Sequence, residues 1–131
     1  MYGLRRLRQL VEEGKTGAIR ILLVEDDKHL LPLLEHMLLS NGYHVAIADS
    51  VATGLSILRS QPFDLLITDV NLPDGIGLTI AEEALAAGIK VLVMTAHGLS
   101  LMPGSLAKYD YLLKPIRGTE LLAAVHRHLA E

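Results

Sequence analysis

The chain has 131 residues, of which 50% are hydrophobic and 21% are charged, and it contains no cysteine. This length fits a single domain, and the composition is too apolar for a disordered chain. The net charge of −3 gives no basic footprint for nucleic acid, and no apolar run reaches the ~20 residues of a membrane span. The lack of cysteine excludes disulfides and thiolate metal sites, so we expect a cytoplasmic domain in a reducing compartment.

Residues 1–18 form a leader that differs in charge from the rest of the chain. The leader carries a net charge of +2, which leaves −5 on residues 19–131. Leu4, Leu7 and Val11 recur at helical spacing, and two glycines end the pattern. We expect a leader helix or linker over 1–18 and one domain over 19–131; a frayed terminus is the other interpretation of the leader.

From Ala18 onward, short apolar runs alternate with segments of helical spacing. A continuous apolar run is typical of a strand that is buried on both faces of a sheet. Apolar residues three and four positions apart indicate a helix. The predicted elements are strand 19–24, a helix around 30–38 closed by Asn41-Gly42, strand 43–48, a helix around 51–58 opened by Asp49 or Ser50, strand 64–68, a helix around 78–85 ended by Gly88, strand 90–94, strand 109–113 and a helix around 121–129.

This regular alternation predicts an α/β domain. Strands separated by helices pair in parallel through right-handed crossovers, which gives a doubly wound five-stranded parallel sheet with helices on both faces. The segment between Thr95 and Lys114 contains Gly98, Pro103 and Gly104, which are poor residues for a helix interior. We therefore expect the fourth helix to be short or irregular.

Charged and hydroxyl side chains follow the predicted strands at the points where the strands end. The carboxyl ends of parallel strands meet at one edge of the sheet, so these side chains should converge there. Three carboxylates about 5 Å apart repel by roughly 3 kcal/mol per pair, so such a cluster is costly without a cation. The residues are Glu25, Asp26 and Asp27 after the first strand, Asp69 after the third, Thr95 after the fourth and Lys114 after the fifth.

The residue types in this cluster favour magnesium-dependent phosphoryl transfer. Mg²⁺ takes carboxylate oxygens together with waters and phosphate oxygens. A carboxylate can attack phosphorus to give an aspartyl phosphate, and a lysine and a hydroxyl can hold the phosphoryl oxygens. Each residue taken alone has a simpler interpretation, as a solvated loop carboxylate, a cap or a turn residue.

Four segments, ILLVEDDKHL, DLLITDVNLPDGIGL, VMTA and YLLKP, resemble the signatures of response-regulator receiver domains. These domains belong to the CheY-like superfamily of two-component signalling. The resemblance extends from about Ile19 to Leu129, and it implies a flavodoxin-like sheet with strand order 2-1-3-4-5. The interval from Thr95 to Lys114 is a few residues shorter than is usual in the family, which again predicts a reduced fourth helix.

The resemblance implies a phosphorylation site and a metal site. Asp69 matches the phosphoaccepting aspartate of the family. Glu25 and Asp26 match the acidic pair that binds Mg²⁺ or Mn²⁺, with Asp26 as the direct ligand. The backbone carbonyl of Asn71 matches the third protein ligand, and Asp69 completes the set.

Other positions match the residues that bind the phosphoryl group and report its arrival. Thr95 matches the switch hydroxyl, and Lys114 matches the phosphoryl-binding lysine, whose head we expect at the exposed edge of the sheet. Tyr111 matches the aromatic that rotates inward in the active state; an ordinary strand aromatic is the alternative. His97 is a candidate for tuning the phosphoryl lifetime together with Asn71; a solvated loop histidine is the alternative.

The implied function is a phosphoacceptor switch. A histidine kinase, a histidine phosphotransfer protein or a small phosphodonor phosphorylates Asp69, and a partner reads the resulting change at the surface. Such a chain is no enzyme beyond its own phosphorylation and dephosphorylation. One alternative is a receiver-fold docking module that acts without phosphorylation. The other is a haloacid-dehalogenase-like phosphatase, but its second acid would fall at Asn71, which cannot act as an acid–base.

The expected partners are a kinase or phosphotransfer protein and an unknown output partner, without direct contact to nucleic acid or membrane. We expect a monomer or a weak homodimer. No output domain follows Glu131, so the chain is expected to be either a stand-alone receiver or one excised from a longer protein such as a hybrid kinase.

Overall fold

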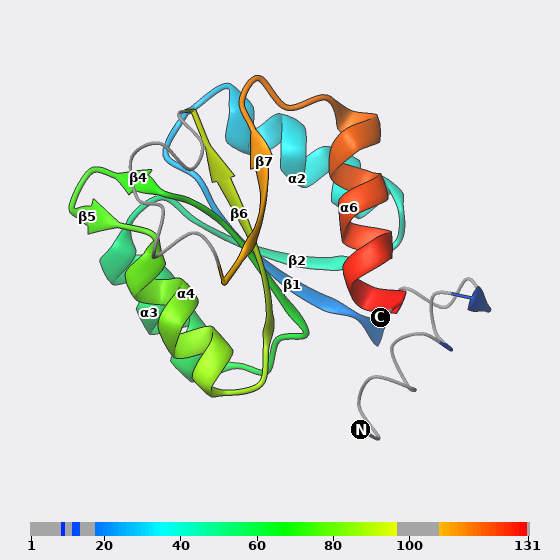
Figure 1. Cartoon of the computed structure of the whole chain (residues 1–131), viewed down its shortest axis with the longest axis horizontal. Coiled ribbons are helices and arrows are strands. Elements are labelled where there is room, and N and C mark those ends of the chain that lie inside the picture. The colour runs from blue at the N-terminus through cyan, green and yellow to red at the C-terminus, as the bar shows by residue number, and fades with distance from the viewer. Residues whose placement is uncertain (1–8, 10–11, 14–17, 97–107, 131) are drawn as a thin grey trace.

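A five-stranded parallel sheet forms the centre of the computed structural model, which describes residues 9, 12–13, 18–96 and 108–130 (Figure 1). The strand order is β2-β1-β3-β6-β7. This is the predicted order 2-1-3-4-5, and the doubly wound α/β fold is confirmed. The strands are β1 (Arg20–Val24), β2 (His44–Ala48), β3 (Leu65–Asp69), β6 (Lys90–Thr95) and β7 (Asp110–Leu113).

Helices cover both faces of the sheet. α2 (Leu30–Ser40) and α6 (Gly118–Ala130) lie on one face, and α3 (Val51–Ser60) and α4 (Leu78–Ala86) lie on the other (Figure 1). Each face has its own apolar core, because β1 and β3 are buried on both sides and send alternate side chains in opposite directions. Among the described residues, no helix has the length and apolar character needed to span a bilayer.

The ends of the helices follow local sequence signals. The backbone amide of Asn41 donates to the carbonyl of Leu38 at 3.1 Å, and the amide of Gly42, whose φ is 88°, donates to the carbonyl of Leu39 at 3.0 Å. The hydroxyl of Ser50 accepts the amide of Thr53 at 3.1 Å, so Ser50 rather than Asp49 opens α3. The predicted leader helix and the predicted short fourth helix fall mostly or wholly on residues 1–17 and 97–107, outside the described parts of the chain.

A small antiparallel hairpin follows β3 directly and was not predicted. It consists of β4 (Asn71–Leu72) and β5 (Gly75–Ile76). Strands of two residues carry no measurable periodicity, so the pattern of apolar residues could not reveal them. The hairpin lies next to the carboxyl end of β3 and therefore beside the predicted site.

Candidate functional site

The parallel sheet places its polar residues at one edge. Glu25 follows β1, and its amide bonds the carbonyl of Ala48 at the end of β2 at 3.0 Å. Asp69 is the last residue of β3. The amide of Lys114 bonds the carbonyl of Thr95 at 2.9 Å, which brings the ends of β6 and β7 together. The convergence predicted from the strand ends is thus observed.

Three carboxylates lie together at this edge. One oxygen each from Glu25, Asp26 and Asp69 lies within 4.8 Å of the other two. Glu25 is fully buried and Asp69 is 6% exposed, whereas Asp26 faces solvent. Hard carboxylate oxygens with one side open to water match the ligands that Mg²⁺ takes in proteins. The residues present therefore fit a divalent cation.

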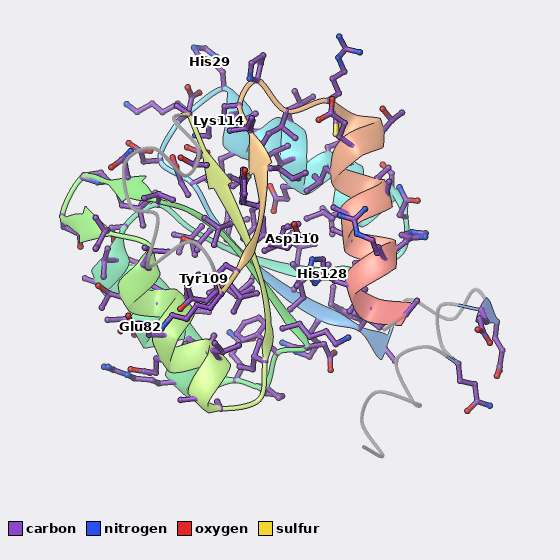
Figure 2. All side chains as sticks on the ribbon, viewed as in Figure 1. His29, Glu82, Tyr109, Asp110, Lys114 and His128 are labelled. Carbon is purple, nitrogen blue, oxygen red and sulfur yellow. The ribbon has the colours of Figure 1, made fainter. Side chains whose placement is uncertain are left out.

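Lys114 bridges the two buried carboxylates. Its Nζ lies 2.7 Å from Glu25 Oε1 and 2.8 Å from Asp69 Oδ2. Figure 2 shows Lys114, after β7, at the same end of the sheet as His29, before α2. Tyr109 and Asp110 lie at the opposite end of β7 (Figure 2). The lysine lies at the predicted edge of the sheet, but its side chain is only 21% exposed, so it is more deeply placed than the prediction of an exposed head implied. The two buried negative charges draw the ammonium group into the pocket.

Burial and charge shift the pKa values of this pair. Burial raises the pKa of Glu25, and the Asp69 charge adds to this, while the Lys114 ammonium and the Asp27 amide offset part of the rise. Burial disfavours the charge on Lys114, but the ion pairs with Asp69 and Glu25 outweigh it, and its pKa is raised. The lysine therefore stays charged at neutral pH, and Glu25 is the carboxyl whose ionisation the fold opposes.

Asp27 holds both Glu25 and the start of α2. Its amide donates to Glu25 Oε2 at 3.0 Å, and its own Oδ1 accepts the amides of His29 at 2.8 Å and Leu30 at 2.9 Å. These bonds, that of Leu30 first, lower the pKa of Asp27. Sequence reasoning placed Asp27 in the acidic cluster without a role. An aspartate three residues before the first helical residue is a capping signal that could have found it.

Of the other predicted site residues, Thr95 and Asn71 lie at the edge of the sheet that carries the carboxylates, and Tyr111 does not. Thr95 is 2% exposed at the end of β6, and the Asn71 amide lies 3.4 Å from Asp69 Oδ1. Tyr111 pairs with Val93 in the sheet and packs, half-buried, against the core under α3 and α4. The structure therefore places Tyr111 in the sheet rather than among the carboxylates. His97 lies outside the described residues.

The sequence of the chain matches a known protein family and several of its members. The response regulator receiver domain matches residues 21–126. The two-component response regulator ORR24 of Oryza sativa subsp. indica is 38% identical over 117 residues, which are 85% of this chain and 18% of that protein. The cell cycle transcriptional regulator CtrA of Caulobacter vibrioides is 30% identical over 113 residues, 82% of this chain and 49% of that protein. The chain thus spans half or less of these relatives.

Solved structures of receiver domains superpose on this chain. A CheY-like receiver domain protein from Methanospirillum hungatei JF-1 superposes with a TM-score of 0.78 at 31% identity, covering 85% of this chain and 93% of that one. The receiver domain of a Pseudomonas aeruginosa sensor histidine kinase, solved with magnesium in its active-site cleft, gives 0.77 at 27%, covering 86% and 98%. Fold, site and sequence define a signalling domain of the two-component class. The chain belongs to the response regulator receiver domain family.

Proposed function

We propose that this chain is a phosphoacceptor switch in which Asp69 takes the phosphoryl group in a Mg²⁺-dependent reaction. One observation carries the proposal: Asp69 shares its edge of the sheet with two further carboxylates, within 4.8 Å, and with an ammonium group 2.8 Å from its own Oδ2. A carboxylate held in this way can act as a nucleophile towards phosphorus. A histidine kinase or histidine phosphotransfer protein is the proposed donor, and a small acyl phosphate could replace it.

The chain's own residues supply most of the chemistry. An oxygen of Asp69 forms a bond to phosphorus while the bond from phosphorus to the donor breaks, and the donor leaves with the electron pair. Lys114 balances the charge on the phosphoryl oxygens, and the Thr95 hydroxyl is the proposed donor of a hydrogen bond to one of them. Water later hydrolyses the acyl phosphate to aspartate and phosphate.

Glu25, Asp26, Asp69 and the Asn71 carbonyl are the proposed ligands of the cation. When bound, Mg²⁺ would neutralise negative charge on the oxygens of the phosphoryl group during the transfer. Glu25 is fixed by the hydrogen bond from the Asp27 amide and by its ion pair with Lys114, so it presents a pre-oriented carboxylate rather than a mobile one. Within the Glu25–Asp26 pair, Asp26, which faces solvent, is the proposed direct ligand.

Phosphorylation by a small donor tests this function. The full chain incubated with acetyl phosphate and Mg²⁺ should gain the mass of one phosphoryl group, and EDTA or Asp69→Asn should abolish the gain. Asp64→Asn is the matched control, because Asp64 directly precedes β3, at the end of the strand opposite Asp69, where its Oδ2 accepts the Arg20 amide at 2.9 Å. An adduct that persists on Asp69→Asn contradicts the assignment, and a parent chain that stays unmodified favours a docking module.

A further inference from the structure

Asp74, in the turn of the β4–β5 hairpin, is bonded to the first amides of α3. Its Oδ1 accepts the amide of Val51 at 2.7 Å, and its Oδ2 accepts the amide of Ala52 at 2.9 Å. The first amides of a helix have no partner within the helix, so a carboxylate at this position is well bound. These two bonds, that of Ala52 first, lower the pKa of Asp74. The carboxylate is therefore ionised at neutral pH.

The same hairpin is fixed at its base against Asp69. The amide of Gly77 donates to the carbonyl of Val70 at 2.7 Å. A side chain at Gly77 would collide with the Asp69 carbonyl oxygen and would lie 2.6 Å from Thr68 Oγ1. The chain therefore closes tightly on the end of β3 at Gly77.

The residues between these two attachments include Asn71. Asn71 is the first residue of β4, and it pairs with Ile76 across the hairpin. A side-chain carbon added to Gly75 would lie 3.5 Å from Val51 Cγ2, so the backbone beside the turn passes close to α3. The β4–β5 hairpin lies beside α3 (Figure 1), and Asn71, the first residue of β4, lies between its two attachments.

We propose that Asp74 is a positioning residue for the metal centre: it fixes the hairpin to α3 and thereby holds the Asn71 carbonyl in place beside Asp69. This inference rests on the proposed function, because Asn71 is a proposed ligand. Without the two bonds, the hairpin keeps its base at Gly77 but loses its outer attachment. The Asn71 carbonyl then samples more orientations, and the chain binds Mg²⁺ less tightly.

A purely structural role for Asp74, as a cap of α3, makes a different prediction. Ser50 provides the matched control because its hydroxyl caps the same helix from within, through the amide of Thr53, whereas Asp74 reaches the helix from the hairpin. Ser50→Ala and Asp74→Ala both remove side-chain acceptors from the start of α3. Only Asp74→Ala also releases the hairpin.

Titration of the full chain with MgCl₂, followed by amide NMR shifts without any phosphodonor, tests the inference. Asp74→Ala should raise the Mg²⁺ concentration at half-saturation by about tenfold, the lower end of what loss of a ligand-orienting partner costs. Asp74→Asn, which keeps one acceptor oxygen, should fall between Asp74→Ala and the parent. Ser50→Ala should leave the half-saturation concentration unchanged even where it lowers the melting temperature.

Hydrogen exchange in metal-free buffer gives a second readout. The amides of Leu72 and Gly75, which form the hydrogen-bonded pair of the hairpin, should exchange faster in Asp74→Ala than in the parent or in Ser50→Ala. An Asp74→Ala chain whose Mg²⁺ titration matches that of Ser50→Ala overturns the inference and leaves the proposed function intact. A parent chain without any Mg²⁺ response overturns the metal centre itself, and the role of Asp74 with it.

Discussion

At the scale of single residues, Lys114 stabilises the acidic site in the absence of metal by pairing with two of its carboxylates. Its ammonium group lies 2.7 Å from Glu25 and 2.8 Å from Asp69, and both carboxylates are buried. Asp26 adds a third negative charge within 4.8 Å of these two. One positive charge does not balance three negative ones, so the metal-free site retains mutual repulsion among its carboxylates. The pKa of Glu25 is raised first by its burial, and the Asp69 charge adds to the rise.

Removing one carboxylate should therefore stabilise the metal-free chain. In EDTA and low salt, Asp69→Asn should raise the free energy of unfolding by about 1 kcal/mol, because it relieves repulsion while Lys114 keeps Glu25 as a partner. For a domain of this size the melting temperature should rise by a few degrees. Millimolar Mg²⁺ should stabilise the parent more than the variant, since binding to the native state adds stability by mass action.

Melting curves of the two chains, each in EDTA and in Mg²⁺, check this expectation. If the Lys114–Asp69 ion pair were mainly a structural salt bridge, the signs would reverse. Asp69→Asn would then melt below the parent in EDTA, and Mg²⁺ would change little. That outcome would refute the account of a repulsive acidic pocket.

Removing the lysine should have the opposite effect and should depend on pH. Lys114→Met keeps much of the side-chain volume but leaves buried Glu25 without its cation. At about pH 7 it should lower the free energy of unfolding by about 2 kcal/mol, less than is typical of a fully buried pair. The pKa of Glu25, already raised, should rise further.

The pH dependence follows from the sign of that shift. A raised folded-state pKa means that the protonated Glu25 is favoured by folding. Its stabilisation is complete below the ordinary value of 4.5 and is lost as pH rises through the raised value. The melting-temperature deficit of Lys114→Met, measured in EDTA, should therefore shrink as pH falls towards 4.5. A deficit that stays constant across this range would assign the effect of Lys114 to packing alone.

At the scale of elements, the β4–β5 hairpin links the site to the helices on one face of the sheet. Its base closes on the end of β3 through Gly77, and its turn is bonded to α3 through Asp74. Movement of the hairpin would therefore change both the environment of Asp69 and the start of α3. The close approach at Gly77 leaves no room for a side chain.

Gly77→Ala should destabilise the chain by about 3 kcal/mol, because its methyl group meets rigid backbone at Asp69. Gly54→Ala is the matched control. There a methyl group would meet Ile80 Cδ1 at 2.6 Å, the far end of a flexible side chain. Alanine also favours the helix by about 1 kcal/mol, so Gly54→Ala should be nearly neutral. Chemical denaturation measures both, and equal stability losses would contradict the tight closure at Gly77.

The turn of the hairpin has a local sequence signal, but the attachment of the hairpin to α3 has none. Pro73-Asp74-Gly75 indicates a turn, but the partners of Asp74 lie 22 and 23 residues earlier in the chain. A local pattern cannot show a contact over that separation. The caps at Ser50 and Asn41 were predictable because each acts on residues within its own helix.

At the scale of the whole molecule, the sheet and the convergence of the site were predictable together. Continuous apolar runs identified the buried strands, and in a parallel sheet the residues after those strands must meet at one edge. That reasoning placed Glu25, Asp26, Asp69 and Lys114 correctly. It could not give the depth of Lys114, because the burial of a long side chain depends on its charged partners rather than on its strand.

Locating the phosphoryl group on the chain tests the central claim most directly. The parent, treated with acetyl phosphate and Mg²⁺ and then with borohydride, should show one modified peptide, because hydride reduces an aspartyl phosphate to homoserine. The account predicts homoserine at position 69 alone, formed only when Mg²⁺ is present. Reduction at Asp26 or Asp27 in place of Asp69, or at position 69 with equal yield in EDTA, would contradict a magnesium-dependent phosphoacceptor at Asp69.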